Sequence, residues 1–507
     1  MVSATLTSPR FSVRLYKSIS RKPGEAGLPT SSRYADKDPY IDLTPFLGDG
    51  SSIVTAKNIN QPAGTFQLTF ADRPKTTTQL IGSVPLDSSL ETVYGLVEPM
   101  DLVEIRMWSG KGRCPDPLPI KMRGFVTEIT RARQSGPDGR PLRTVTVSGQ
   151  DYGKILQTYQ ILYLPNYEGS KPLLTGFNFF EQFGEQARNV ITGGDFIKML
   201  LDKAVNVLLD SLIPKGSPMP RTIQADIQAT GMMNNSYMQQ EGSVYELLKS
   251  FLDVPVWNEF YIEDREEGVF LVWRPLPYYD LMSQTTIQKL AKEPVFVTIP
   301  DNEIVSLRQE RNDESVFNFY WCTAQRFDLV DDLYRRQEAF DQNANQVTME
   351  YPNSDHDYYG LRTMYADTVM GAEDVNNMNS GLTLTDQDKR SNIMTAWLAS
   401  RRQTMILNNR DNVVFERGSM EIKGGPMRPN TTDAMKAGDY VTVLDGRITW
   451  DAYVISIQDN FQPFRNYRTV LQFERGNGFA MRVSQAAGNS PWLTEQVERH
   501  AERGIFR

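Results

Sequence analysis

Residues 438–476 read GDYVTVLDGRITWDAYVISIQDNFQPFRNYRTVLQFERG, and this stretch decides the fold. Apolar residues alternate with their neighbours in three successive runs, for example at Val441 and Val443. A period of two that is interrupted by turn residues predicts antiparallel strands with one buried face. Asp445-Gly446 predicts a hairpin turn after the first strand, because glycine adopts positive φ without steric cost.

Residues 99–154 carry the same pattern earlier in the chain. Residues 101–105 align with residues 439–443, and residues 124–129 align with residues 452–457, with the same apolar parity in both pairs. We therefore predict a duplicated β-unit. Two unrelated β-domains that obey the same strand rules are the alternative.

The third strand of the two copies aligns less simply. Arg143-Thr144-Val145 resembles Arg468-Thr469-Val470, but the alternation of the following residues disagrees. A β-bulge or a one-residue shift would restore the parity, and the sequence leaves both open.

A pair of shorter strands is expected ahead of each copy. The number of residues between Ile53 and Phe66 equals the number between Ile304 and Phe317. Each of the four residues lies in an apolar strand pattern. We therefore expect the aromatic run 316–321 to be the second copy's equivalent of residues 65–70.

Composition places the chain among large folded proteins. Its 507 residues suggest roughly three or four domains of about 150 residues. With 40% hydrophobic residues and 24 Phe, 22 Tyr and 7 Trp, the chain can build sizeable cores. The net charge of −8 argues against a dedicated nucleic-acid binder, which needs a basic surface to neutralise phosphates.

Few residues offer catalytic or metal chemistry. Two cysteines, Cys114 and Cys322, give neither a disulfide framework nor a CxxC metal spacing. The two histidines are His356, in a polar Ser-Asp-His-Asp loop, and His500, among charged residues near the end of the chain. We interpret Cys322 as a core residue, Cys114 as a loop residue and both histidines as solvated.

Other candidate motifs also favour structural roles. Gly193-Gly194 and Gly424-Gly425-Pro426 match no phosphate-binding fingerprint. The pair Asp331-Asp332 is too common a pattern to indicate a glycosidase, and the stripe Phe317, Phe319 and Trp321 is more typical of a core. We therefore predict a non-enzymatic protein with no catalytic, cofactor-binding or metal-binding residues and no cofactor.

The termini and the apolar runs bear on localisation. The segment MVSATLTSPRFSVRLYK lacks the apolar core of a signal peptide, and no run approaches the ~18 apolar residues of a membrane span. We expect synthesis in the cytoplasm and no membrane segment.

The expected fold class is α+β and β-rich, with two similar antiparallel β-barrel domains, an inserted α+β domain and a helical excursion. Local signals mark the helices: Thr192 is the expected cap of a helix that begins near Gly194, and Ser243 with Glu246 forms a capping box. The expected domains are an N-terminal arm at 1–40, β-barrel domain 1 at 41–160, an α+β insertion at 161–300, β-barrel domain 2 at 301–324 and 437–480, an inserted irregular domain at 325–436 with a helix at 385–409, and a C-terminal tail helix at 481–507.

The chain resembles the baseplate hub proteins of contractile-tailed phages, the late-control-D and hub family that is related to secretion-system spike hub domains. The resemblance is one of pattern and order, and it covers most of the chain. The residues that carry it are 41–70, 122–152, 242–274 and 419–473, above all Ala437-Gly438-Asp439-Tyr440-Val441 followed by Ala452-Tyr453-Val454.

The resemblance implies a mechanical function. It implies a virion protein of the tail baseplate that forms a homotrimeric ring, a symmetry adaptor between a sixfold tail tube and a threefold central spike. The implied partners are the tail tube protein, the central spike protein, baseplate wedge or tube-initiator proteins and the tape measure protein, while DNA passes the lumen without specific binding. The alternatives are a phage-associated cell-wall hydrolase, which requires a cleft with paired carboxylates, and a tail-tip receptor-binding protein, which exposes an aromatic patch.

Overall fold

The computed structural model describes residues 8–18, 40–71, 93–111, 114–135, 141–161, 192–233, 242–281, 283, 285–324, 352–371, 384–446 and 448–486. The described chain is mostly antiparallel β-sheet with few helices. This agrees with the β-rich class that the alternation predicted. The predicted N-terminal arm falls largely outside the described residues, and so does most of the predicted C-terminal tail helix, including His500.

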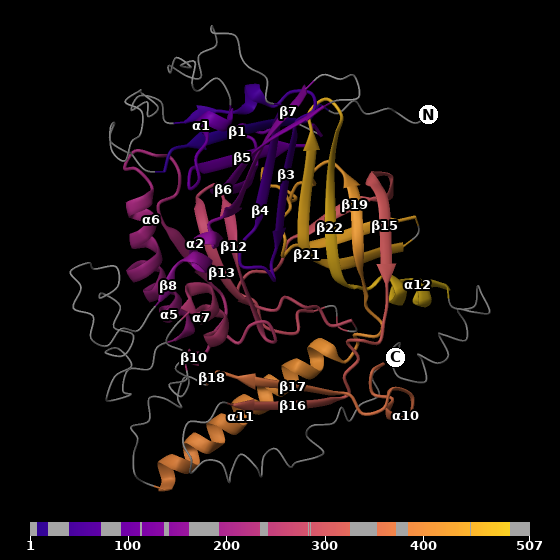
Figure 1. Ribbon diagram of the computed structural model, residues 1–507. Helices are drawn as coiled ribbons and strands as arrows, with labels where there is room; N and C mark the ends of the chain where they lie inside the picture. Colours follow the sequence, from indigo (N-terminus) through magenta and orange to yellow (C-terminus); the bar gives the residue numbers. More distant parts are fainter. Residues whose placement is uncertain are drawn as a thin grey trace, which may run out of the picture.

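One large sheet dominates the described residues (Figure 1). It holds 13 strands in the order β15-β19-β22-β21-β3-β4-β7-β6-β5-β1-β2, with β20 pairing β21 and β14 pairing β20. The strands of its first half are β1 (Arg10–Tyr16), β2 (Ile41–Asp42), β3 (Ser52–Asn58), β4 (Thr65–Ala71), β5 (Leu102–Trp108), β6 (Ile120–Ser135) and β7 (Pro141–Asp151). Those of its second half are β14 (Phe296–Pro300), β15 (Ile304–Glu310), β19 (Glu416–Lys423), β20 (Tyr440–Asp445), β21 (Ile448–Gln462) and β22 (Asn466–Gly476).

The two halves repeat one strand order. β3-β4-β7-β6-β5 in the first copy corresponds to β15-β19-β22-β21-β20 in the second. Each copy has a bulge at the same place, between Val126 and Glu128 in β6 and between Val454 and Ser456 in β21. We call these two five-strand sets copy 1 and copy 2.

The register resolves the parity problem of the third strand. Val126 is opposite Gly149, and its counterpart Val454 is opposite Phe473, so Gly149 corresponds to Phe473. Val145 therefore corresponds to Thr469 rather than to Val470. The one-residue shift is the correct alternative, because the bulge is common to both copies.

The expected partner of the lead-in strand was wrong. Residues 319–324 form β16 (Phe319–Ala324), which pairs in parallel with β17 (Thr363–Thr368) in a separate sheet. The counterpart of β4 is instead β19, about a hundred residues further along the chain. The equal spacing was misleading because copy 2 is interrupted between β15 and β19.

An aromatic–glycine pair links the same two strands in each copy, with its members exchanged. Phe66 of β4 is opposite Gly149 of β7, whereas Gly418 of β19 is opposite Phe473 of β22. Phe66 and Phe473 are both buried. The Phe66 ring lies over Gly149, as in pairs where a ring covers the gap that a glycine leaves on its neighbour, whereas the atoms nearest to Gly418 belong to the main chain of Arg308 and Gln309.

An α+β module lies between the copies in sequence. Thr192 Oγ1 accepts the backbone N–H of Asp195 at the start of its first helix, and Ser243 and Glu246 form the predicted capping box. β12 and β13 pair as an antiparallel hairpin. The elements of this module are α5 (Gly193–Leu200), η4 (Leu201–Val205), α6 (Asn206–Leu212), β9 (Ile223–Ile227), α7 (Val244–Phe251), β12 (Asn258–Arg265) and β13 (Gly268–Pro275).

A smaller module lies below the large sheet in Figure 1. The long helix α11 (Leu384–Asn409) packs beside β16 and matches the helix expected at 385–409. Trp257 connects this module to the insertion, since its indole N–H donates to the carbonyl of Arg401 at 3.0 Å. The short elements elsewhere are η2 (Thr44–Phe46), α1 (Val93–Leu96), α2 (Gly153–Thr158), β8 (Gln160–Ile161), β10 (Met232–Met233), β11 (Gly242–Ser243), η5 (Asp301–Glu303), α10 (His356–Tyr359), β18 (Met370–Gly371) and α12 (Gly478–Ala486). No helix in the described ranges has the length and apolarity needed to cross a membrane.

Candidate functional site

The same aspartate turn opens the first long hairpin of each copy. Asp101 precedes β5, and its carboxylate accepts the backbone N–H of Glu98 at 2.8 Å. Asp439 precedes β20, and its carboxylate accepts the backbone N–H of Lys436 at 2.9 Å. The main-chain carbonyls of the two aspartates accept N–H groups of Val126 and Val454, at 2.8 and 3.0 Å. Both side chains are buried, so these bonds fix the turn.

The residue before each aspartate adopts a left-handed conformation. Met100 has φ of 70° and Gly438 has φ of 93°. A side chain at positive φ is strained, which glycine avoids. The turn before Asp439 is therefore unstrained at Gly438, whereas the equivalent turn before Asp101 holds Met100 in a strained conformation.

The cations beside the two aspartates differ. Lys17 lies 2.7 Å from Asp101, whereas Arg428 contacts both carboxylate oxygens of Asp439, at 2.9 and 2.8 Å. Burial raises the pKa of each aspartate, and the neighbouring cation opposes that rise. The bidentate pairing with Arg428 fixes the orientation of the Asp439 carboxylate more strictly than the contact from Lys17 fixes that of the Asp101 carboxylate.

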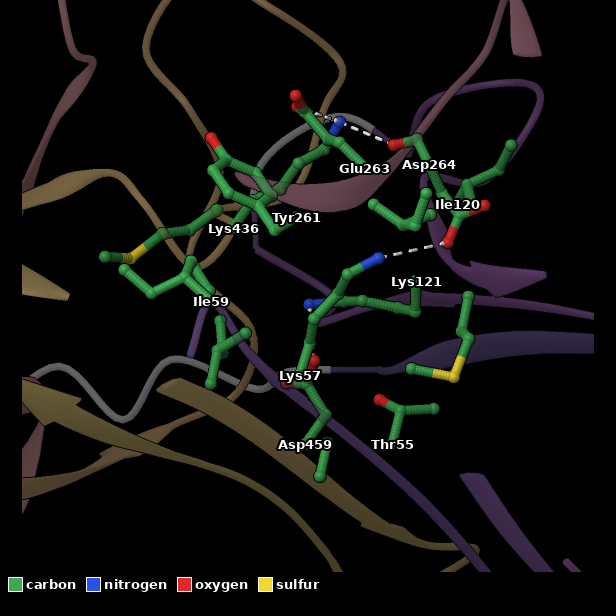
Figure 2. A pocket seen from close by; sticks show the side chains of 16 residues that line it. Thr55, Lys57, Ile59, Ile120, Lys121, Tyr261, Glu263, Asp264, Lys436 and Asp459 are labelled. Carbon is green, nitrogen blue, oxygen red and sulfur yellow. Dashed lines mark hydrogen bonds and ion pairs between the residues drawn. The ribbon is translucent and has the colours of Figure 1, made fainter. Parts of the chain in front are cut away.

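Copy 1, copy 2 and the insertion meet at a pocket that is lined by charged side chains (Figure 2). Three of the ion pairs around it join different parts of the chain. Lys121 of copy 1 lies 2.8 Å from Asp459 of copy 2, and Lys57 of copy 1 lies 3.7 Å from Asp264 of the insertion. Lys436 of copy 2 lies 2.9 Å from Glu263 of the insertion. We call this cluster the three-way junction.

The charges of the junction are balanced. Burial alone would raise the pKa of Glu263, but Lys436, Arg265 and Arg428 hold it well below its ordinary value. Burial would lower the pKa of Lys57, but Asp151 and Asp264 raise it. The Lys57 ammonium lies 3.0 Å from Asp151, in an ion pair without hydrogen-bond geometry. Because each of these charges already has a partner of opposite sign, the pocket is suited to holding domains together rather than to binding an ionic ligand.

Further contacts extend the junction. Arg106 and Arg123 of copy 1 reach the β12–β13 turn, at Glu266 (2.9 Å) and at the carbonyl of Arg265 (2.7 Å). Arg274 of β13 donates to the carbonyl of Gly438 at 2.8 Å, beside the aspartate turn of copy 2. The hairpin β12–β13 therefore positions both copies.

The residues considered for chemistry from the sequence do not come together. His356 begins α10, Cys114 lies beside the Pro9–Phe11 segment, and Cys322 lies on β16. Burial raises the pKa of the Cys322 thiol to about 12, so it stays protonated and unreactive at neutral pH. Asp331 and Asp332 lie outside the described residues. Within the described part of the chain, no group of three or more His, Cys, Asp or Glu side chains is placed to hold a metal ion.

Sequence reasoning missed the functional meaning of the aspartate turn and the whole three-way junction. The turn had a signal, because Asp101 and Asp439 were aligned as equivalent residues. The junction had none, because its partners are separated by long stretches of sequence and converge only in the folded chain.

No family model matches the sequence, and no curated protein matches it. Solved structures are similar to the chain. A tail protein from Neisseria meningitidis MC58 has a TM-score of 0.45 and 11% identity, over 92% of this chain and 96% of its own. The 43 kDa tail protein of prophage MuSo2 from Shewanella oneidensis has a TM-score of 0.41 and 11% identity, over 92% and 96%.

A component of the type VI secretion system of E. coli, which is described as structurally similar to tail proteins of bacteriophage T4, has a TM-score of 0.34 and 7% identity, over 84% of this chain and 73% of its own. The structural neighbours are thus phage tail and baseplate proteins and secretion-system components.

Proposed function

We propose that this protein is a structural component of a phage tail and forms the central hub of the baseplate. In this proposal copies 1 and 2 are two similar barrel domains, and three chains form a ring of six such domains around a channel. The observation that carries it is the repeated strand order β3-β4-β7-β6-β5 and β15-β19-β22-β21-β20. A chain with two equivalent units converts threefold symmetry into approximate sixfold symmetry, which is useful where a sixfold tube meets a threefold spike.

Copy 1 and copy 2 already contact each other as two neighbours in such a ring would. β21 of copy 2 pairs with β3 of copy 1 from Ser456 opposite Asn58 to Phe461 opposite Ile53. One sheet therefore runs from copy 2 into copy 1 without interruption (Figure 1). A ring repeats this contact between chains.

One face of this sheet suits a channel for DNA. Gln67 is opposite Ser148, and Ser419 is opposite Gln472, on the face away from the buried rows of Leu68 and Leu471. These four side chains are polar and uncharged and interact weakly with phosphates, whereas Arg308, opposite Ser419 on β15, places a cation at the edge of the same face. The tail tube, central spike, wedge or tube-initiator and tape measure proteins remain the proposed partners.

Sedimentation analysis of the purified chain over a range of concentrations tests the proposal. It predicts a species of three chains as the largest closed assembly. A stable dimer or hexamer, or a monomer that stays monomeric when the tube and spike proteins are added, would refute the trimeric hub.

A further inference from the structure

Two strands of the large sheet, β6 and β15, have an edge with no strand beside it in the described residues. Their counterparts β21 and β3 pair with each other along the corresponding edges. β21 pairs along one edge with β22, and along the other with β20 and then with β3. Its counterpart β6 pairs along one edge with β7 and along the other with β5 only, as far as Phe125. β15, the counterpart of β3, is the end strand of the sheet and pairs with β19 alone.

Exposure follows this difference. Ile457 and Phe461 of β21 are 7% and 5% exposed beneath the contact with β3. Their counterparts in β6 are Ile129, which is half-buried, and Arg133, which is exposed. In β15, Leu307 and Gln309 are half-buried, whereas their counterparts in β3, Ile53 and Thr55, are 0% and 4% exposed. Both edges therefore lack the cover that their counterparts have.

We propose that β15 of one chain pairs antiparallel with the outer half of β6 of a second copy of this chain, in the register of the internal β21–β3 contact. The proposal rests on the proposed ring and names its contact surface. The internal pair Gln458–Ala56 corresponds to Thr130 opposite Glu310, and Asn460–Val54 corresponds to Ala132 opposite Arg308.

The side chains are compatible with this register. Along the proposed contact no opposed pair holds two charged side chains, so no like charges face each other across the strands. The contact also satisfies main-chain donors and acceptors that an open edge otherwise leaves to solvent or to unrelated strands. In Figure 1 β15 lies at the right of the sheet and β6 toward the left, so one chain offers the two edges on different sides.

The register is tested by a disulfide between chains. Ala132→Cys and Arg308→Cys are combined in a Cys114→Ser background and oxidised mildly. Opposed residues of antiparallel strands have Cα atoms about 4.5–5.5 Å apart, which is within disulfide reach. We expect most chains to run as covalent dimers and trimers on a non-reducing gel.

The matched controls are each single variant, and Ala132→Cys with Val305→Cys, which lies out of register at the bulge of β15. These should remain largely monomeric on the gel. A trimer in sedimentation that gives no crosslink, or that crosslinks equally through Val305→Cys, overturns the proposed contact and leaves the ring standing. Absence of any trimer overturns both.

Hydrogen exchange on the unmodified protein gives a second readout that needs no substitution. Amides of residues 128–133 and 304–310 should exchange at least tenfold more slowly in the trimer than in the dilute monomer. Unchanged exchange in both segments of a proven trimer would contradict the proposal.

Discussion

Copies 1 and 2 have the same strand order and the same bulge, yet the strands that pair with β6 in copy 1 differ from those that pair with β21 in copy 2. β21 is covered along its outer half by β3, whereas the outer half of β6 has no strand beside it in the described ranges. The five-strand fold therefore forms with or without a strand beside this edge. Because β3 covers the edge of β21 within the chain, we expect a strand of another chain to cover the corresponding edge of β6.

The copies also differ in what stabilises their opening turn. In copy 2 the turn at Asp439 is held by Arg428 and lies against the insertion through Lys436 and Glu263. In copy 1 the turn at Asp101 is held by Lys17, which directly follows strand β1. The opening turn of copy 2 thus contacts the insertion, whereas the opening turn of copy 1 contacts the residue after the N-terminal strand.

The largest expected effect concerns the exchanged aromatic–glycine pair. Phe66→Ala should destabilise copy 1 by about 3–5 kcal/mol, because it opens a cavity over Gly149. Phe66→Leu keeps part of the apolar volume over Gly149 and should cost less than Phe66→Ala. Urea denaturation monitored by tyrosine and tryptophan fluorescence measures both. Equal losses in the two variants would show that the side chain of residue 66 does not fill the space over Gly149.

The second prediction compares the two aspartate turns. Asp101→Ala leaves a backbone N–H without its acceptor and removes the nearer carboxylate of Lys17, which keeps Glu98 at 3.6 Å, and should cost about 1–3 kcal/mol. Asp439→Ala also removes the bidentate partner of Arg428 and should cost more, about 3–5 kcal/mol. Asp439→Asn keeps an acceptor for the Lys436 N–H and should restore part of the stability. Equal losses in the two alanine variants would contradict the stronger pairing assigned to copy 2.

The smallest expected effect is a pH dependence that belongs to the junction of copy 2. The pKa of Glu263 is held below its ordinary value by Lys436, Arg265 and Arg428, despite burial. Its stabilising contribution is therefore complete above the unfolded pKa of about 4.3 and is lost as the pH falls through the lower folded pKa. Glu263→Gln should be less stable than the parent by about 1–3 kcal/mol at pH 7.

This difference should shrink only below about pH 4.3. Thermal melts from pH 3 to pH 7 measure it, with Glu267→Gln as the control, since Glu267 lies exposed in the same turn. A Glu263→Gln deficit that already disappears between pH 7 and pH 5 would show that the junction cations do not hold this carboxylate ionised.

Local sequence patterns predicted much of the fold. The strands around Val441 and Val103 and the capping box at Ser243 follow from alternation and capping within short windows. The partner of β15 was mispredicted because β19 lies beyond a long interruption, while the aromatic run 316–321 happened to have the right spacing. Register between distant strands is set by packing across the sheet, which a single sequence does not display.

The candidate site was less predictable for the same reason. Asp101 and Asp439 were visible as equivalent residues, but their buried bonds were not. The ion pairs Lys121–Asp459 and Lys57–Asp264 join residues that meet only after three parts of the chain have folded together. No periodicity or motif signals such a pair.

A cryo-electron microscopy reconstruction of the assembled protein tests the central claim most directly. The account predicts three chains around an open channel, with six similar units in alternation and β15 of each chain paired with β6 of the next. A ring of one or six chains, or three chains whose β15 and β6 edges face solvent, would contradict it.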